Sequence, residues 1–331
     1  MYNFHNLSAN RKAYLIAALE VFPDLSDTIT REQMNRITAI KGIDAQWLRL
    51  PENRAARGSY KFPKPTETTT TQAVHHEETD EEISNRIKDT YESMETLVAA
   101  VSSNVVNSLI ISGAPGLGKS HTVNKVLNEV NNGSEYNYVF HKGYLRASHL
   151  FRLLWENRFK GMTIVIDDSD AIFTDENALN ILKSALELKE SRRIGWGSEK
   201  VFEDQDGEEI PRYFDYEGSI IFLTNKDIRG EIASNSKNAP HLSALESRSL
   251  LLDLKIKTRK EYMVKIRQTV SSGMLEQKGF NQFEVDEIMD FIEQHMEELT
   301  ELSLRMVEKI AALFRSNHNN WEKLVKAVCF K

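Results

Sequence analysis

The feature that most constrains the fold is the glycine-rich segment 113–120, which reads Gly-Ala-Pro-Gly-Leu-Gly-Lys-Ser. A glycine, four further residues and then Gly-Lys-Ser is the spacing of a phosphate-binding loop. The apolar run 105–112 before it predicts a buried β-strand, and apolar residues at helical spacing in 121–130 after it predict an α-helix. Strand, tight turn and helix form the setting in which such a loop holds phosphate. The segment therefore predicts an α/β fold with a nucleoside triphosphate site.

Each part of this loop has a chemical task. Glycines let backbone N–H groups turn inward around phosphate oxygens, where a Cβ would clash. We expect the Lys119 ammonium to reach the β- and γ-phosphates and the Ser120 hydroxyl to ligate Mg²⁺. The residues expected to contact the nucleotide are Gly113, Pro115, Gly116, Leu117, Gly118, Lys119, Ser120 and His121.

Two later apolar runs are predicted to be strands that end in polar residues at the same crevice. The run that starts at Gly161 is followed by Asp167 and Asp168, and the run 219–225 ends at Asn225. A hard cation and an attacking water both require oxygen anions near the phosphates. We expect Asp167 to hold Mg²⁺ and Asp168 to activate the water. A solvated acidic turn is disfavoured directly behind a buried strand.

Composition excludes several classes of protein. The net charge of −7 gives the whole molecule no attraction to nucleic acid or acidic membranes. A single cysteine, Cys329, cannot form an internal disulfide framework and fits a reducing compartment. The N-terminus lacks a secretory pattern, and no apolar run reaches membrane-spanning length. We expect a soluble, cytoplasmic protein without a membrane partner.

The 331 residues leave room for several domains. Residues 1–63 predict helices followed by a basic strand and loop, which resembles a winged-helix unit. They hold nine basic and six acidic residues, so this domain either binds DNA or is an adaptor with an ordinary solvated face. Residues 64–81 are polar and low in complexity, as in a flexible linker. We assign 82–254 to the nucleotide-binding domain and 255–331 to a C-terminal helical domain.

The order of motifs resembles the AAA+ ATPases over roughly residues 82–315. The resemblance implies a parallel-sheet core with an α-helical lid, Mg²⁺-dependent ATP hydrolysis and a homo-oligomeric ring, usually of six subunits. It makes Asn225 the sensor 1 residue that orients water. It makes Arg248, in the segment 240–249, the arginine finger that acts in a neighbouring subunit, with Arg192 and Arg193 as rivals. It makes Arg305 the sensor 2 residue of the lid.

One departure from the AAA+ pattern leaves two functions open. The family usually has Asp-Glu where this chain has Asp167-Asp168, and the shorter side chain allows slow hydrolysis. One interpretation is a ring that remodels or translocates a polymer, either protein or nucleic acid. The segment 142–144 stands where many members carry a pore loop, and the hairpin 193–214 resembles one of DNA-acting members. The other interpretation is a nucleotide-gated loader or switch. The layout also resembles AAA proteins of bacteriophages, which would act in the host cytoplasm.

Overall fold

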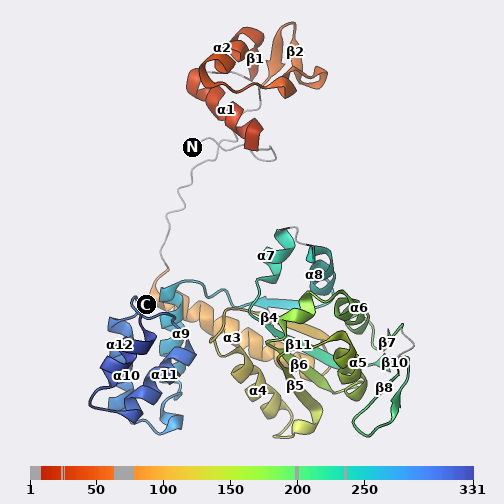
Figure 1. The fold of residues 1–331 in the computed structure, drawn as a ribbon, viewed down its shortest axis with the longest axis vertical. Coiled ribbons are helices and arrows are strands. Elements are labelled where there is room, and N and C mark those ends of the chain that lie inside the picture. Colours follow the sequence, from red (N-terminus) through yellow and green to blue (C-terminus); the bar gives the residue numbers. More distant parts are fainter. Residues whose placement is uncertain (1–8, 24, 26, 63–77, 198–200, 235–236) are drawn as a thin grey trace. The chain divides into compact units, whose positions relative to one another are not determined.

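The computed structural model describes residues 9–23, 25, 27–62, 78–197, 201–234 and 237–331. The chain divides into two compact units, Met1–Glu77 and Glu78–Lys331, each of which is described by itself (Figure 1). The predicted linker 64–81 lies outside the described residues except for 78–81. Asp80, near its end, already begins a long helix.

The N-terminal unit has the helix, strand, helix and hairpin order of a winged-helix-like domain. Its antiparallel sheet has the order β1-β3-β2, and β1 comes from residues that the sequence indicated only as the approach to a helix. Thr30 caps α2 with a capping box, and Gly42 (φ 70°) ends it. The elements are α1 (Ala9–Val21), β1 (Thr28–Thr30), α2 (Arg31–Lys41), two 3₁₀ turns (Gln46–Arg49 and Pro51–Asn53), β2 (Arg54–Ala56) and β3 (Ser59–Lys61).

This small unit has its own core and a basic hairpin. Tyr14, Ile37 and Leu48 are fully buried in one apolar cluster, and burial raises the pKa of Tyr14 to about 12. Arg54 and Lys61 lie exposed on the β2–β3 hairpin. The unit is therefore a packed domain that presents positive charge on its hairpin.

The second unit is built on a five-stranded parallel sheet with the order β12-β4-β11-β6-β5. Apolar side chains alternate between its two faces, as in a strand covered on both sides. On β4, for example, Ile110 joins one apolar cluster while Leu109 and Ile111 join the other. The strands are β4 (Ser108–Ser112), β5 (Tyr138–Lys142), β6 (Thr163–Asp167), β11 (Ser219–Thr224) and β12 (Leu250–Asp253).

Helices cover both faces of this sheet. Side chains of α5 and α6 belong to the same cluster as Ile110, and side chains of α3 and α4 belong to the cluster of Leu109 and Ile111. Two short helices, α7 and α8, follow β11 (Figure 1). The helices are α3 (Asp80–Ser102), α4 (Lys119–Val130), α5 (Ala147–Glu156), α6 (Glu176–Ala185), α7 (Ile228–Ala233) and α8 (Ala239–Glu246).

Several predicted elements are confirmed with shifted ends. The first strand of the sheet begins at Ser108, because α3 ends in a turn with Asn104 at φ 56° and Val105 is 78% exposed. The sequence pattern predicts a strand over 136–140, and β5 begins two residues later, after a 3₁₀ turn at Glu135–Asn137. It predicts a helix over 177–190, and α6 ends five residues earlier, at Ala185. Each error lies at a polar boundary, where local pattern is a weak guide.

The predicted hairpin before β11 is confirmed and contains a second, smaller ribbon. β7 (Arg192–Gly195) pairs with β10 (Tyr213–Tyr216), and β8 (Phe202–Glu203) pairs with β9 (Glu209–Ile210). Arg192 is only 2% exposed, and its guanidinium donates to the carbonyl oxygens of Tyr216 (3.0 Å) and Gly218 (2.5 Å). The interpretation of Arg192 as a rival arginine finger is therefore wrong, because its buried side chain binds the carbonyl groups at the base of the hairpin.

The C-terminal residues form a helical lid with a separate apolar core, as predicted. In the view of Figure 1, the lid and the hairpin lie on opposite sides of the sheet. Cys329 is buried in the lid, as expected for a small apolar helix residue. The lid consists of α9 (Arg259–Ser271), a 3₁₀ turn (Glu276–Lys278), α10 (Gln282–Gln294), α11 (Leu304–Ser316) and α12 (Trp321–Cys329).

Charged groups fasten the first turns of α3 to the lid helix α9. Asp80 forms an ion pair with Arg267 (2.8 Å), and Arg86 forms one with Glu261 (2.5 Å). The Lys260 ammonium also donates to the carbonyl oxygen of Glu78. The start of the second unit is therefore joined to the lid. None of the helices in the described part of the chain has the length and apolarity to cross a membrane.

Candidate nucleotide-binding site

The glycine-rich loop connects β4 to α4 in a conformation that glycine favours. Gly116 and Gly118 have φ values of 74° and 83°. A Cβ on Gly116 would lie 2.6 Å from the Cβ of Ser303, the residue that caps α11. The backbone N–H of Leu304 donates to the Gly116 carbonyl oxygen over 2.9 Å. The loop therefore touches the start of a lid helix directly. Both the positive φ of Gly116 and its close approach to Ser303 favour glycine at this position.

Lys119 lies at the centre of the site. Its side chain is largely buried, and its ammonium donates to the carbonyl oxygen of Ala114 (2.9 Å) and to Oδ1 of Asn225 (2.8 Å). Burial lowers the pKa of Lys119 to about 8, although Asp168 and Asp167 act in the opposite direction. A partly desolvated cation beside a loop of inward N–H groups is suited to binding phosphate.

The two predicted acids and the predicted amide meet at the carboxyl ends of neighbouring strands. β6 ends at Asp167, which is the register partner of Leu223 on β11. Asp168 follows with φ 53°, a left-handed conformation that is uncommon for a side chain other than glycine. The amide nitrogen of Asn225 donates to Oδ1 of Asp168 over 3.1 Å. Lys119, Asn225 and Asp168 thus form one hydrogen-bonded chain.

Asp167 has the surroundings of a cation ligand. Its carboxylate is buried, and the Lys142 ammonium, at the end of β5, lies 3.5 Å from Oδ2. Asp167 and Ser120 line the same cleft and offer the oxygen donors that Mg²⁺ prefers. Among the described residues, no group of three or more His, Cys, Asp or Glu side chains is arranged to hold a metal by itself. These residues fit Mg²⁺ bound jointly with phosphate oxygens.

The lid contributes Arg305 to the same space. Ser303 caps α11 and accepts from the Met306 N–H over 3.1 Å, which places Arg305 in the first turn of that helix. Arg305 is near enough to Lys119 for its charge to lower the pKa of Lys119. Two cations, one from the loop and one from the lid, therefore lie at one end of the site.

These residues surround a cleft of about 950 Å³, which we call the P-loop cleft. Gly113 lies beneath it, and its carbonyl oxygen accepts a hydrogen bond from Lys119 (2.5 Å). The predicted site residues that line the cleft are Pro115, Gly116, Leu117, Gly118, Lys119, Ser120, His121, Asp167, Asp168, Asn225 and Arg305.

Arg248 does not line the cleft of its own chain. It follows α8, and its guanidinium donates to the carbonyl oxygen of Ala244 (2.8 Å). Arg193, the other rival, lies exposed on the hairpin, 5.4 Å from the ring centre of Tyr213. Arg248 and Arg193 are thus the two predicted arginines that have partly or fully exposed side chains outside the cleft.

Sequence reasoning missed a second group of cleft residues on α3 and α9. The Tyr91 hydroxyl donates to the Leu117 carbonyl oxygen (2.5 Å), and the Lys265 ammonium lies 3.3 Å from the Tyr91 ring centre. Gln268 donates to the carbonyl oxygen (2.7 Å) and the hydroxyl (2.8 Å) of Ser84. Helical spacing marked Tyr91 only as a core residue. Lys265 carries no sequence signal, since a lysine on a helix is usually solvated.

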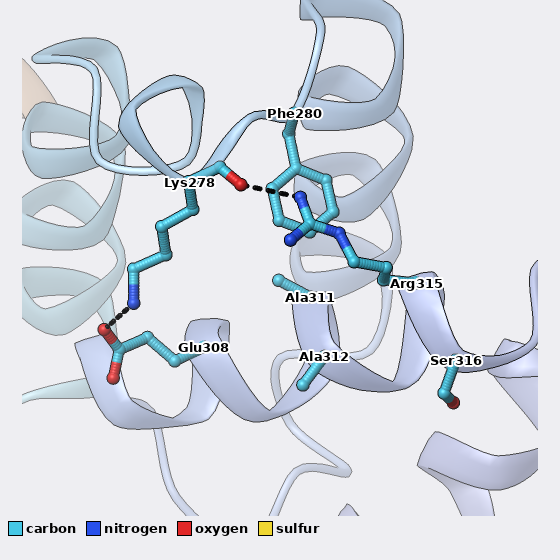
Figure 2. Close-up of a pocket in the computed structure, with 7 residues that line it drawn as sticks. All are labelled: Lys278, Phe280, Glu308, Ala311, Ala312, Arg315 and Ser316. Atoms are coloured by element: carbon cyan, nitrogen blue, oxygen red, sulfur yellow. Dashed lines mark hydrogen bonds and ion pairs between the residues drawn. The ribbon is translucent and has the colours of Figure 1, made fainter.

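A smaller pocket of about 400 Å³ lies within the lid (Figure 2). Arg315 lies over the Phe280 ring (4.2 Å to its centre) and donates to the Lys278 carbonyl oxygen (2.7 Å). The Lys278–Glu308 ion pair (2.5 Å) borders both this pocket and the P-loop cleft. Its polar groups satisfy one another, so it gives no indication of a separate ligand.

The sheet order, the phosphate loop and the helical lid together define the class of protein, an AAA+ P-loop fold. The chain belongs to the same family as an uncharacterized 36.7 kDa protein of Enterobacteria phage T4, from the nrdC-mobD intergenic region. The two are 33% identical over 250 residues, which cover 72% of this chain and 76% of the phage protein. No protein-family model matches the chain.

Solved structures give more distant similarities. A mutant of RuvB from Thermotoga maritima is 14% identical with a TM-score of 0.40, and the match covers 76% of this chain and 70% of RuvB. NtrX from Brucella abortus in complex with ATP is 14% identical with a TM-score of 0.40, over 71% and 52% of the two chains. The replication initiator DnaA bound to AMPPCP and single-stranded DNA is 13% identical with a TM-score of 0.36, over 72% and 63%.

Proposed function

We propose that the protein binds ATP and hydrolyses it in a Mg²⁺-dependent reaction, as a ring-forming AAA+ ATPase. The observation that carries this proposal is the chain of contacts from Lys119 through Asn225 to Asp168 beside the phosphate loop. The loop N–H groups and Lys119 bind the phosphates. Asp168 accepts a proton from the attacking water, and Asn225 holds that carboxylate in place.

Mg²⁺ fits Ser120 and Asp167 in this scheme. When bound, it would neutralise charge that develops on the phosphates. Asp168 is one methylene shorter than the glutamate usual at this position, so its carboxylate reaches less far towards the water. We therefore expect turnover to be slower than in AAA+ ATPases that have glutamate there.

We propose that ring formation, with six subunits as the expected number, completes the site. Arg248 is held at the end of α8 and does not line its own cleft, which supports a role in the cleft of a neighbouring subunit. Arg305 would sense the γ-phosphate from the lid. ATP binding and hydrolysis would then change the angle between lid and core and move a protein or nucleic-acid polymer.

A second candidate function is a nucleotide-gated loader or switch, in which hydrolysis only releases a bound partner. Two observations favour it: the short Asp168 side chain, and a separate N-terminal unit with Arg54 and Lys61 exposed on its hairpin. That unit would hold DNA or a protein partner. Because the T4 relative is a phage protein, we expect either activity to take place in the host cytoplasm.

ATPase rates measured with single-stranded DNA, duplex DNA and unfolded protein in parallel would separate these functions. Strong stimulation by one polymer supports the motor. Tight ATP binding with negligible turnover under all three conditions supports the switch. A chain that binds no ATP at all would contradict both proposals.

Subunit mixing tests the ring. Asp168→Asn and Arg248→Ala variants should each be inactive alone, because one lacks the base and the other lacks the finger. Mixed in equal amounts, they should regain roughly a quarter of the activity, since that fraction of interfaces combines an intact Asp168 with an intact Arg248. Mass photometry with ATP reports the subunit number. A fully active Arg248→Ala variant would assign the role elsewhere, and Arg193 would be the next residue to test.

A further inference from the structure

The P-loop cleft has two ends that differ in charge. At the phosphate end, defined by Lys119, Asp168 and Arg305, the charges act on one another, because Asp168 raises and Arg305 lowers the pKa of Lys119. At the other end, defined by Tyr91, Lys265 and Gln268, burial lowers the pKa of Lys265 and Glu95 acts in the opposite direction. Lys265 belongs to the lid helix α9 and Lys119 to the start of α4, so the two cations enter the cleft from different elements.

Lys265 is an ammonium with unused donors. It extends from the lid helix α9, and one side of the ammonium lies against the Tyr91 ring at 3.3 Å. Among the described residues, the ammonium of Lys265 has no hydrogen bond and no ion pair within 4.0 Å, and its backbone carbonyl oxygen accepts from the Thr269 hydroxyl. Burial lowers its pKa to about 8, although Glu95 acts in the opposite direction. A half-buried cation with unused donors that lines a cleft of this size is suited to an acceptor from a ligand.

The ring of Tyr91 fixes where that acceptor must lie. The Tyr91 hydroxyl is held by the Leu117 carbonyl oxygen of the phosphate loop, so the ring cannot turn away. The ring fixes the ammonium in turn, since cation–π contact favours a position over its face. The remaining donors are available to a ligand in the cleft, which Lys265 lines together with the phosphate loop. A triphosphate seated on the loop and on Lys119 would extend its nucleoside towards them.

We propose that Lys265, fixed by Tyr91, is a specificity-determining residue that donates a hydrogen bond to the nucleoside half of a bound nucleotide. This inference rests on the proposed nucleotide site and assigns its second end. The ligand group is a ring nitrogen or carbonyl oxygen of the base, or an oxygen of the ribose. The same contact makes the lid respond to a complete nucleotide and not to phosphate alone.

The test compares ATP with inorganic tripolyphosphate, which lacks the nucleoside. Affinities for both, each with Mg²⁺, are measured by isothermal titration calorimetry for the wild type, Lys265→Met and Lys88→Met. Lys265→Met keeps the length of the side chain but removes its donors. Lys88→Met is the matched control, because Lys88 lines the same cleft from α3 but is 70% exposed and already lies near Glu92.

We expect Lys265→Met to weaken ATP binding by about tenfold, the usual loss for one hydrogen bond to a charged group, and to leave tripolyphosphate binding unchanged. Lys88→Met should change neither affinity by more than about twofold. Equal losses for ATP and tripolyphosphate in Lys265→Met would overturn the proposal and place the ammonium on the phosphates. Unchanged ATP affinity would overturn it as well.

Two controls make the result of this experiment interpretable. If thermal melting shows that Lys265→Met is unfolded, Lys265→Leu likewise removes the charge and the donors, and the same pair of affinities decides. If the wild type binds neither ATP nor tripolyphosphate, the proposed nucleotide site itself has failed. If it binds both equally well, the site stands and the assignment of Lys265 has failed.

Discussion

The two ends of the P-loop cleft are built in different ways. The phosphate end uses residues that stand together in short motifs, with Lys119 and Ser120 in one loop and Asp167 and Asp168 in one strand end. The other end joins Tyr91 to Lys265, two helical residues far apart in the chain. Chemistry that depends on backbone geometry leaves a local pattern, whereas recognition by long side chains from separate helices leaves none.

The largest effect should come from the phosphate end. Lys119→Ala removes the cation expected to contact two phosphates, so affinity for both ATP and tripolyphosphate should fall by about 100-fold or more. Calorimetry measures both. A variant that lost affinity for ATP alone would erase the distinction between the two ends.

Asp168→Asn should separate binding from chemistry at that same end. The amide keeps the size of the side chain but cannot accept a proton, so the hydrolysis rate should fall by about 100-fold or more while ATP affinity stays within a few-fold of the wild type. Steady-state phosphate release and calorimetry together report this. Sustained turnover would show that another residue activates the water.

Tyr91→Phe tests whether the two ends are mechanically joined. The change removes the bond to the Leu117 carbonyl but keeps the ring beneath Lys265, so it should lower the free energy of unfolding by about 1 kcal/mol. ATP and tripolyphosphate should weaken together by a few-fold, because the loop is less well fixed. Denaturant unfolding and calorimetry measure the two effects. A loss confined to ATP would assign the hydroxyl to the nucleoside end.

A dependence on pH should be confined to the end that holds Lys265. The pKa of Lys265 lies near 8, so the free protein loses this charge as the pH rises from about 7 to about 9. The ratio of ATP to tripolyphosphate affinity in the wild type, divided by the same ratio in Lys265→Met, should therefore fall by about five- to tenfold over that range, and the division cancels the ionisation of the ligands. The ratio cancels the titration of Lys119, which affects both ligands. The wild type and Lys265→Met share the other charged groups on this part of the cleft, so the effects of those groups cancel when the two proteins are compared. These groups are Lys88, Glu92, Glu95, Lys278 and Glu308.

The sequence was informative wherever a residue's task is tied to a backbone feature. Gly116 and Gly118 need positive φ, and Asp167 and Asn225 must stand where parallel strands end, so pattern alone predicted the sheet, the loop and these neighbours. The lid and the AAA+ fold followed from the resemblance carried by those motifs.

Other features depend on packing that no local pattern encodes. The burial of Arg192 follows from carbonyl groups more than twenty residues away, and the contact of Ser303 with Gly116 joins segments from opposite ends of the unit. The left-handed conformation of Asp168 and the approach of Lys142 to Asp167 likewise arise only when neighbouring strands are placed side by side.

The ion pairs at the start of α3 bear on how a load would travel through the protein. The covalent path out of the first unit enters the second at Glu78 and Asp80, and both residues are tethered to α9 before the chain reaches the sheet. A force applied along that path would therefore act first on α9, the helix that carries Lys265. If the first unit holds a partner as proposed, a force from that partner would act on the lid side of the P-loop cleft before it acts on the sheet.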